Sequence, residues 1–228
     1  VPVFLKWGAD WLQKRGELQR SSDDRVGTVI VGASATARAI AKALMSSSQP
    51  VWLIDNNMNN CELAKSEGLN AVYGNALDGK ILQEAKLADA RWLLALTPNA
   101  EVNMLTAQLA YNVFSVPEVY VLLSRTQNGS LPSMLSEIGA YPITSDDLNI
   151  KVWDELIGHD KQMQQHEVHI QDTTKLKSML EIFRSNEKSV LPLAVAKNGH
   201  RIPFIASNGL ESGDLVVYLQ NDVAQTVE

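Results

Sequence analysis

The sequence of 228 residues has little of several features that would mark particular protein classes. Its single cysteine, Cys61, excludes an internal disulfide and fits a reducing compartment. The chain has no excess of positive charge, because its net charge is −6 and no basic stripe is present, so nucleic acid and anionic membrane surfaces are poor candidates for partners. No apolar run approaches the roughly 20 residues of a membrane span, and no signal-peptide layout is present.

Motifs of common enzyme classes are also missing. The chain has no Gly-x-Ser-x-Gly elbow and no phosphate loop that ends in Gly-Lys-Ser/Thr. None of its five tyrosines has a lysine four residues later, the pair that short-chain hydride-transfer enzymes require. His166 and His169 are three residues apart, a spacing that points them to opposite faces of a strand. We therefore predict a non-enzymatic protein with no catalytic residue and no metal site.

What is present begins with the stretch from Val26 to Leu44, VGTVIVGASATARAIAKAL. It predicts a short buried strand, a glycine turn and an amphipathic helix, which together form the first half of a βαβ unit. Gly32 occupies the first position of the dinucleotide-binding glycine fingerprint, Ser34 the second and Ala37 the third. Two of the three glycines are therefore replaced, and the fingerprint alone is weak.

Apolar runs that alternate with helical segments continue from there. Further strands are predicted at Val51–Ile54, Ala71–Tyr73, Arg91–Leu96, Val119–Leu123 and Tyr141–Ile143. The intervening helices are expected within Asn56–Gly68, from Asp78 to Lys86, from Thr97-Pro98-Asn99 to Val113 with Pro98 near its first turn, and around Pro132–Ile138. This alternation predicts an α/β fold, a Rossmann-like doubly wound parallel sheet.

The pattern changes towards the C-terminus. We predict a helix over Leu148–Leu156 that ends at Gly158, and a polar linker over Asp160–Gln165. Beyond the linker we expect a smaller α+β domain with antiparallel pairing, whose elements are a strand at Glu167–Ile170, a helix from Thr173 or Thr174, and strands at Val190–Ala196, Arg201–Ile205 and Leu215–Leu219. The predicted division is a connector over 1–24, a Rossmann-like domain over 25–145, a linking helix and linker over 146–165, and an α+β domain over 166–228.

Two residues bear on the ligand of the glycine turn. Asp55 ends the second strand about 20 residues beyond the glycines, where an acid accepts hydrogen bonds from ribose hydroxyls. Ser34 brings a Cβ to the path of a pyrophosphate, so a single phosphate is easier to accommodate than a bridged pair. No arginine follows Asp55 in sequence, which disfavours NADP. The alternative is that the glycine turn is only a turn.

Taken together, the residues resemble a known family. VIVGASATARAIAKAL, VWLID, AVYGNAL and RWLLALTPNAEVNMLTAQLA are similar to the RCK, or TrkA N-terminal, domain, and AVAKNGHRIPFIASNGLESGDLVVYL is similar to the companion TrkA C-terminal domain. The version attached to bacterial sodium/proton antiporters is the most similar, because it shares Gly-Asn-Ala-Leu and Leu-Thr-Pro-Asn. Asn75 departs from the aspartate that most RCK domains have at this place.

The resemblance implies a regulatory module that forms a homodimer on the cytoplasmic face of the inner membrane. It would bind an adenine nucleotide (AMP, ADP or ATP) or NAD(H) and gate a transmembrane antiporter domain located upstream in the same chain, from which residues 1–24 would descend. The residues implied at the ligand are Gly32, Ser34, Ala35 and Thr36 at the phosphate, Asp55 and Asn56 at the ribose, Asn75 and Ala76 near the adenine, and Thr97, Pro98 and Asn99 along the far side.

Several alternatives remain open from the sequence. One is the gating domain or subunit of a potassium channel or uptake system. Another is an NAD-dependent oxidoreductase, which Ser34 and the missing Tyr/Lys pair disfavour. A third is a dimerisation module whose nucleotide site has decayed. We also expect the helix Leu148–Leu156 and the linker Asp160–Gln165 to be the element that moves with the ligand, because both lie between the domains.

Overall fold

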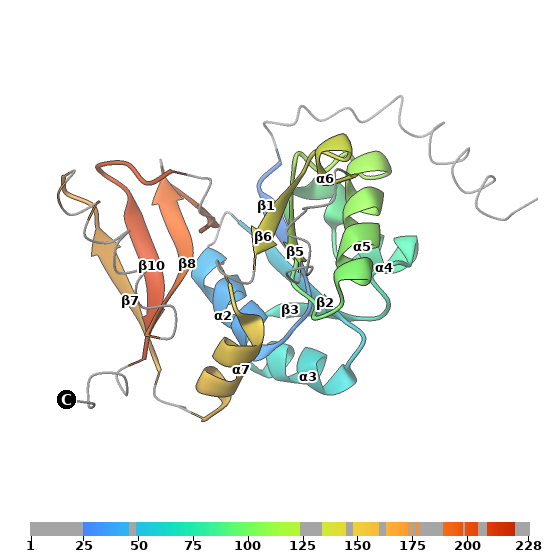
Figure 1. Cartoon of the computed structure of the whole chain (residues 1–228). Coiled ribbons are helices and arrows are strands. Elements are labelled where there is room, and N and C mark those ends of the chain that lie inside the picture. The colour runs from blue at the N-terminus through green and yellow to red at the C-terminus, as the bar shows by residue number, and fades with distance from the viewer. Residues whose placement is uncertain are drawn as a thin grey trace, which may run out of the picture.

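The structure is a computed structural model that describes residues 25–45, 49–123, 134–144, 148–159, 163–172, 174, 177, 189–197, 199–204 and 209–221 (Figure 1). The connector predicted over residues 1–24 lies outside these ranges, as does most of the helix predicted from Thr173 or Thr174. Among the described residues, no helix is long and apolar enough to cross a membrane.

The first part of the chain forms a parallel sheet of six strands. The strands are β1 (Gly27–Val31), β2 (Val51–Asp55), β3 (Asn70–Tyr73), β4 (Ala90–Ala95), β5 (Glu118–Leu123) and β6 (Ala140–Thr144). Their order is β3-β2-β1-β4-β5-β6, and every neighbouring pair is parallel. The predicted doubly wound α/β fold, including its sixth strand, is confirmed.

Helices cover both faces of this sheet, so its strands are buried on both sides. They are α2 (Ala35–Leu44), α3 (Met58–Ser66), α4 (Gly79–Glu84), the short 3-10 helix η2 (Leu87–Asp89), α5 (Ala100–Asn112) and α6 (Met134–Glu137). Within β1, Ile30 joins the apolar cluster on the side of α2 and α3, while Val29 and Val31 join the cluster on the side of α5. This alternation is the period-2 signature of a strand, applied to two cores.

A second, antiparallel sheet follows. Helix α7 (Ile150–His159) leads into β7 (Gln164–His169), and the other strands are β8 (Val190–Lys197), β9 (His200–Pro203) and β10 (Leu215–Gln220). The strand order is β7-β10-β8-β9. The predicted small α+β domain with antiparallel pairing is therefore confirmed in its strands.

Helix α2 joins the two parts of the molecule and lies between the two sheets (Figure 1). It contacts β8, β9 and α7 as well as its own sheet. Its Leu44 belongs to one apolar cluster together with Trp153 of α7, Leu193 of β8 and Val217 of β10. Burying a side chain of this size contributes about 1.5–3 kcal/mol, so the two sheets share part of their stabilisation.

Polar contacts at the C-terminal end of α2 reinforce this joint. Arg201 of β9 donates from Nη1 to the carbonyl oxygen of Ala43 at 2.9 Å and pairs through Nη2 with Glu167 of β7 at 2.9 Å. Gln49 is buried and exchanges two hydrogen bonds with the Arg201 backbone, at 3.0 and 2.6 Å. A cation beside the last carbonyls also suits the helix dipole.

Two predicted boundaries are wrong. Helix α7 continues to His159, past Gly158, because its apolar side stays packed against α2 to the last turn, with Leu156 and Ile157 against the shared cluster. Strand β7 begins at Gln164, inside the predicted linker. The predicted start of helix α5 is confirmed, because Asn99 is its N-cap and Pro98 lies directly before that cap, near the first turn.

Candidate functional site

The carboxyl ends of β1, β2, β3 and β4 meet where the strand order reverses, the usual ligand position in open α/β sheets. We call the four loops there, residues 32–34, 55–57, 74–76 and 97–99, the switch-point site. In the first loop, Gly32 has φ +108°, a conformation that side chains rarely adopt, and its N–H donates to the carbonyl oxygen of Ile54 at 2.7 Å. The turn at Gly32 is therefore required by backbone geometry whatever it binds.

Ser34 is the N-cap of α2, and its Oγ accepts a hydrogen bond from the Ala37 N–H at 3.4 Å. The serine at the second fingerprint position thus caps the helix through a side-chain hydrogen bond, which glycine cannot make. Within the described chain, the backbone amides of Ser34 and Ala35 donate no hydrogen bond to a protein group. Two donors at the positive end of a helix are therefore available to an anion.

Asp55 ties the second loop to the first. Its Oδ2 accepts from the Ala33 N–H at 2.7 Å and from Asn60 Nδ2 at 3.1 Å, and its Oδ1 accepts from the Asn57 N–H at 2.8 Å. The carboxylate thus lies directly beside the glycine turn. Asn56 follows it as an exposed residue.

The third loop is attached to the second by the Gly74 N–H, which donates to the Asp55 carbonyl oxygen at 2.9 Å. Gly74 has no room for a side chain, because a Cβ there would lie 2.6 Å from Cδ1 of Ile81 in α4. Asn75 is exposed, and its Oδ1 accepts from the Leu77 N–H at 2.9 Å, so its side chain shapes a turn. Ala76 is buried in the apolar cluster beneath α4 and α5.

The fourth loop is held by Asn103, a fully buried residue of α5. Its Oδ1 accepts from the Thr97 N–H at 3.0 Å and from Thr97 Oγ1 at 2.6 Å. Its Nδ2 donates to the carbonyl oxygens of Thr97 at 2.8 Å and of Leu122 at 2.9 Å. Asn99 caps α5 by accepting from the N–H groups of Glu101 and Val102. Pro98, between Thr97 and Asn99, is exposed.

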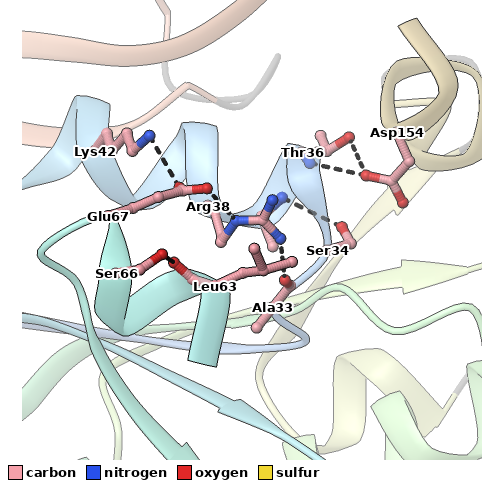
Figure 2. Close-up of polar contacts among 10 residues, drawn as sticks. Ala33, Ser34, Thr36, Arg38, Lys42, Leu63, Ser66, Glu67 and Asp154 are labelled. Atoms are coloured by element: carbon pink, nitrogen blue, oxygen red, sulfur yellow. Dashed lines mark hydrogen bonds and ion pairs between the residues drawn. The ribbon is translucent and has the colours of Figure 1, made fainter. Parts of the chain in front are cut away.

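The N-terminal turn of α2 has a second partner that is distant in sequence. Oδ1 of Asp154, on α7, accepts from the Thr36 N–H at 2.8 Å and from Thr36 Oγ1 at 2.7 Å, as Figure 2 shows. Thr36 is fully buried beneath this contact. A carboxylate of the linking helix therefore lies at the positive end of α2, next to the amides of Ser34 and Ala35.

A cation lies on the other side of the same turn (Figure 2). Arg38 donates from Nη1 to the Ala33 carbonyl oxygen at 2.8 Å and from Nε to Glu67 at 3.0 Å, and Glu67 also pairs with Lys42 at 2.9 Å. Burial raises the pKa of Glu67, but the hydrogen bond from Lys42 and the charge of Arg38 outweigh it and hold that pKa below its ordinary value. The partners of Arg38 are Ala33 and Glu67 rather than Asp55.

A comparison with protein families decides the identity of this region. The model of the TrkA-N domain matches residues 28–145, just over half of the chain. The chain belongs to the TrkA-N family. Its first sheet is thus a TrkA-N domain, and the part of the predicted resemblance that concerns this domain is confirmed.

Curated relatives of this TrkA-N domain are proteins of a potassium uptake system. The Trk system potassium uptake protein TrkA of Haemophilus influenzae is 31% identical over 90 residues, which cover 39% of this chain and 20% of that protein. A TrkA homolog of Methanothermobacter thermautotrophicus is 31% identical over 113 residues, or 49% of this chain and 50% of that protein. The chain thus spans between a fifth and a half of the length of these relatives.

Two solved structures are similar to part or most of this chain. The TrkA-N domain of the inner membrane protein ybaL from Escherichia coli is 21% identical with a TM-score of 0.47, and covers 58% of this chain and 97% of its own. A GsuK channel bound to NAD is 16% identical with a TM-score of 0.45, and covers 93% of this chain and 41% of its own.

The structure brings some of the residues of the predicted site together and not others. Gly32, Ser34, Asp55 and Thr97 lie in adjoining loops, as expected, whereas the Ala76 side chain packs into the core. Asp154 and Arg38 were missed as members of the site. A signal for Arg38 existed, because it directly follows the third fingerprint position, but Asp154 is 118 residues away from its partner.

The sequence also led to predictions about Cys61 and about metal ligands. Cys61 is fully buried in α3, as expected for a structural thiol, and its Sγ lies 3.5 Å from the Asp55 carbonyl oxygen. Burial and, to a lesser degree, the charge of Asp55 raise the pKa of this thiol. In the parts of the chain that are described, no three His, Cys, Asp or Glu residues are grouped as metal ligands.

Proposed function

We propose that this chain is the cytosolic ligand-sensing region of a monovalent cation/proton antiporter. In this proposal it binds an adenine nucleotide or NAD(H) at the switch-point site and gates transport by a membrane domain upstream in the same chain. The observation that carries the ligand is the pairing of two available helix amides, at Ser34 and Ala35, with the Asp55 carboxylate one loop away. A nucleotide carries both matching groups, because its phosphate accepts hydrogen bonds from amides and its ribose hydroxyls donate hydrogen bonds to a carboxylate.

Each proposed contact has a specific chemical basis. The phosphate accepts from the amides of Ser34 and Ala35 at the positive end of α2, with the Gly32 turn bringing the backbone close. The ribose hydroxyls donate to Asp55, which exchanges its hydrogen bond from Ala33 for them. Asn56 flanks the ribose, while Asn75 and the Ala76 backbone border the adenine. Thr97, Pro98 and Asn99 form the far side, and Asn103 makes that side rigid.

The ligand preference follows from Ser34. Its Cβ stands where the backbone of a glycine would let a pyrophosphate pass, so one phosphate group fits with less displacement than a bridged pair. We therefore expect AMP, which has a single phosphate, to bind at least as tightly as NAD(H). ADP also has a bridged pair, but its terminal phosphate carries no second nucleoside and can move aside, so we expect it to bind at least as tightly as well. NADP remains disfavoured, because Arg38 is engaged by Glu67 and Ala33.

The antiporter context rests on the local motifs. Gly74-Asn75-Ala76-Leu77 and Leu96-Thr97-Pro98-Asn99 resemble the motifs at these places in the regulatory regions of bacterial sodium/proton antiporters. In this setting the region is a homodimer on the cytoplasmic face of the inner membrane, with residues 1–24 as the connector, 25–145 as the sensing domain, 146–165 as the link and 166–228 as a TrkA-C-like domain. A ligand gates transport to the extent that it prefers one dimer geometry.

A thermal-shift panel with AMP, ADP, ATP, NAD and NADH tests the binding proposal. A ligand at 100 times its dissociation constant stabilises the folded state by about 2.7 kcal/mol. We expect a clear shift with AMP or ADP that equals or exceeds the shift with NADH. A shift with NADH alone would overturn the assigned role of Ser34, and no shift with any ligand would overturn nucleotide sensing.

A second candidate is a subunit or gating domain of a potassium uptake system or channel. The observation that favours it is the 31% identity with the TrkA protein of Haemophilus influenzae. Sequencing the gene upstream of residue 1 distinguishes the two candidates. Many transmembrane spans in the same reading frame support the antiporter, whereas a selectivity-filter motif or a separate gene supports potassium uptake.

A further inference from the structure

Asp154 has an unusual position for a carboxylate of the linking helix. Its Oδ1 takes both the N–H and the hydroxyl of Thr36, so it uses one of the first-turn donors that an anionic ligand at α2 would approach. The remaining donors, the amides of Ser34 and Ala35, belong to the two preceding residues. The protein's own carboxylate and a ligand phosphate would therefore lie within a single helical turn of each other.

Two anions at one helix end oppose each other. The N-terminus of a helix has the effect of about half a positive charge, which the Asp154 carboxylate already offsets. A nucleotide phosphate adds one or more negative charges beside it in a partly buried position, where the repulsion is screened less than in water. We propose that Asp154 is an intramolecular competitor of the ligand phosphate, which lowers the affinity of the switch-point site for phosphate-bearing ligands. This inference rests on the proposed function, nucleotide binding at that site.

The competition has a structural consequence because Asp154 belongs to α7. The neighbouring Trp153 is buried against α2 and keeps the helix docked, so a bound phosphate weakens the polar end of this contact without removing the apolar part. Helix α7 leads into β7 of the second sheet within five residues. By linkage, whatever loosens the Asp154–Thr36 contact favours phosphate binding, and phosphate binding loosens the contact to the same extent.

The test compares three versions of the full 228-residue chain by calorimetric titration with AMP, ADP and adenosine. Asp154→Asn removes the charge but keeps an oxygen that accepts from Thr36. Glu155→Gln is the matched control, because it removes one negative charge from the next, exposed position of the same helix. We expect Asp154→Asn to tighten AMP and ADP about tenfold or more, within the usual range of coupling between sites. Adenosine affinity and the Glu155→Gln protein should change less than about twofold.

A second measurement needs no variant. In the wild-type chain, AMP should speed amide hydrogen exchange in residues 150–159, whereas adenosine, which has no phosphate, should not. If AMP binds the wild-type chain but Asp154→Asn leaves its affinity unchanged, or Glu155→Gln tightens it equally, the competition is overturned while nucleotide binding stands. If no nucleotide binds any of the three proteins, both the proposed function and this inference are overturned. Should Asp154→Asn fail to fold, the exchange measurement on the wild-type chain decides. Faster exchange of residues 150–159 with AMP but not with adenosine supports the competition, and no difference between the two overturns it.

Discussion

The Oδ2 atom of Asp55 lies 2.7 Å from the backbone nitrogen of Ala33, so the acid after β2 holds the glycine turn after β1. We expect Asp55→Ala to lower the free energy of unfolding by about 1–3 kcal/mol, because the N–H groups of Ala33 and Asn57 lose their acceptor. It should also abolish the thermal shift with AMP or ADP, because the ribose loses its partner. Both effects are measured by denaturation and thermal-shift titration.

Asp78→Ala is the control for Asp55→Ala. Asp78 caps α4 by accepting from the Lys80 N–H at 2.9 Å, and it is not part of the switch-point site. Its loss should cost about 1 kcal/mol of stability and leave the ligand shift intact. A ligand shift that survives in Asp55→Ala would show that the ribose assignment is wrong.

Ser34→Gly should change the ligand preference of the site. The hydrogen bond from the Ala37 N–H to Ser34 Oγ is long, at 3.4 Å, and glycine is a tolerated N-cap, so only a few tenths of a kcal/mol of stability should be lost. Removing the Cβ should raise the affinity for NADH relative to AMP, which competitive titration measures. Ser34→Ala separates the two roles of the serine, because it loses the hydroxyl and keeps the Cβ. An equal gain for NADH in Ser34→Ala would contradict the steric explanation.

Asn103→Ala should be among the most destabilising substitutions at the site. The change leaves the Thr97 N–H and the carbonyl oxygens of Thr97 and Leu122 without their buried partner, at a cost of about 3 kcal/mol or more. Asn99→Ala, which removes only the cap of α5, should cost about 1 kcal/mol. Urea denaturation of the two proteins compares these values, and equal losses would mean that the buried amide does not fix the fourth loop.

Glu67→Gln should make stability less dependent on pH. The folded-state pKa of Glu67 lies below its ordinary value of 4.5, so the carboxylate contributes stability that is present above that value and is lost as the pH falls through the folded pKa. Near neutral pH we expect a loss of up to about 1 kcal/mol, because the ion pairs with Arg38 and Lys42 are partly exposed. The difference between wild type and variant should shrink as the medium becomes acidic. Glu62→Gln is the matched control, because it removes the same charge from an exposed position of α3 and leaves the ion pairs with Arg38 and Lys42 intact.

The sequence predicted the first sheet well because its signals are local. Each strand is an apolar run, and the turn at Gly32 and the cap at Asn99 lie directly beside the elements that they begin or end. The predicted end of α7 was wrong because it depends on a non-local contact. Gly158 is a weak helix former on its own, but the packing of Leu156 and Ile157 against the shared cluster outweighs that local preference.

The site was predicted where the family fingerprint or a strand end marked it, as at Ser34 and Asp55. Asp154 could not be predicted, since its role depends on how α7 docks against α2, and no periodicity or spacing in one sequence fixes that. Asn103 is an intermediate case. Its partner Thr97 is only six residues away, but a polar residue within an amphipathic helix gives no sign that it is buried.

The position of Leu44 and Arg201 on either side of one joint has a consequence for the synthesis of the chain. Helix α2 leaves the ribosome long before β8, β9 and β10, so the face of α2 that contacts β8 and β9 remains exposed to solvent until about 150 further residues have been added. A nascent chain that is halted in that interval exposes an apolar surface that other nascent chains can contact. Because the second sheet packs on this face of α2, we expect it to reduce aggregation of the TrkA-N domain once it has formed.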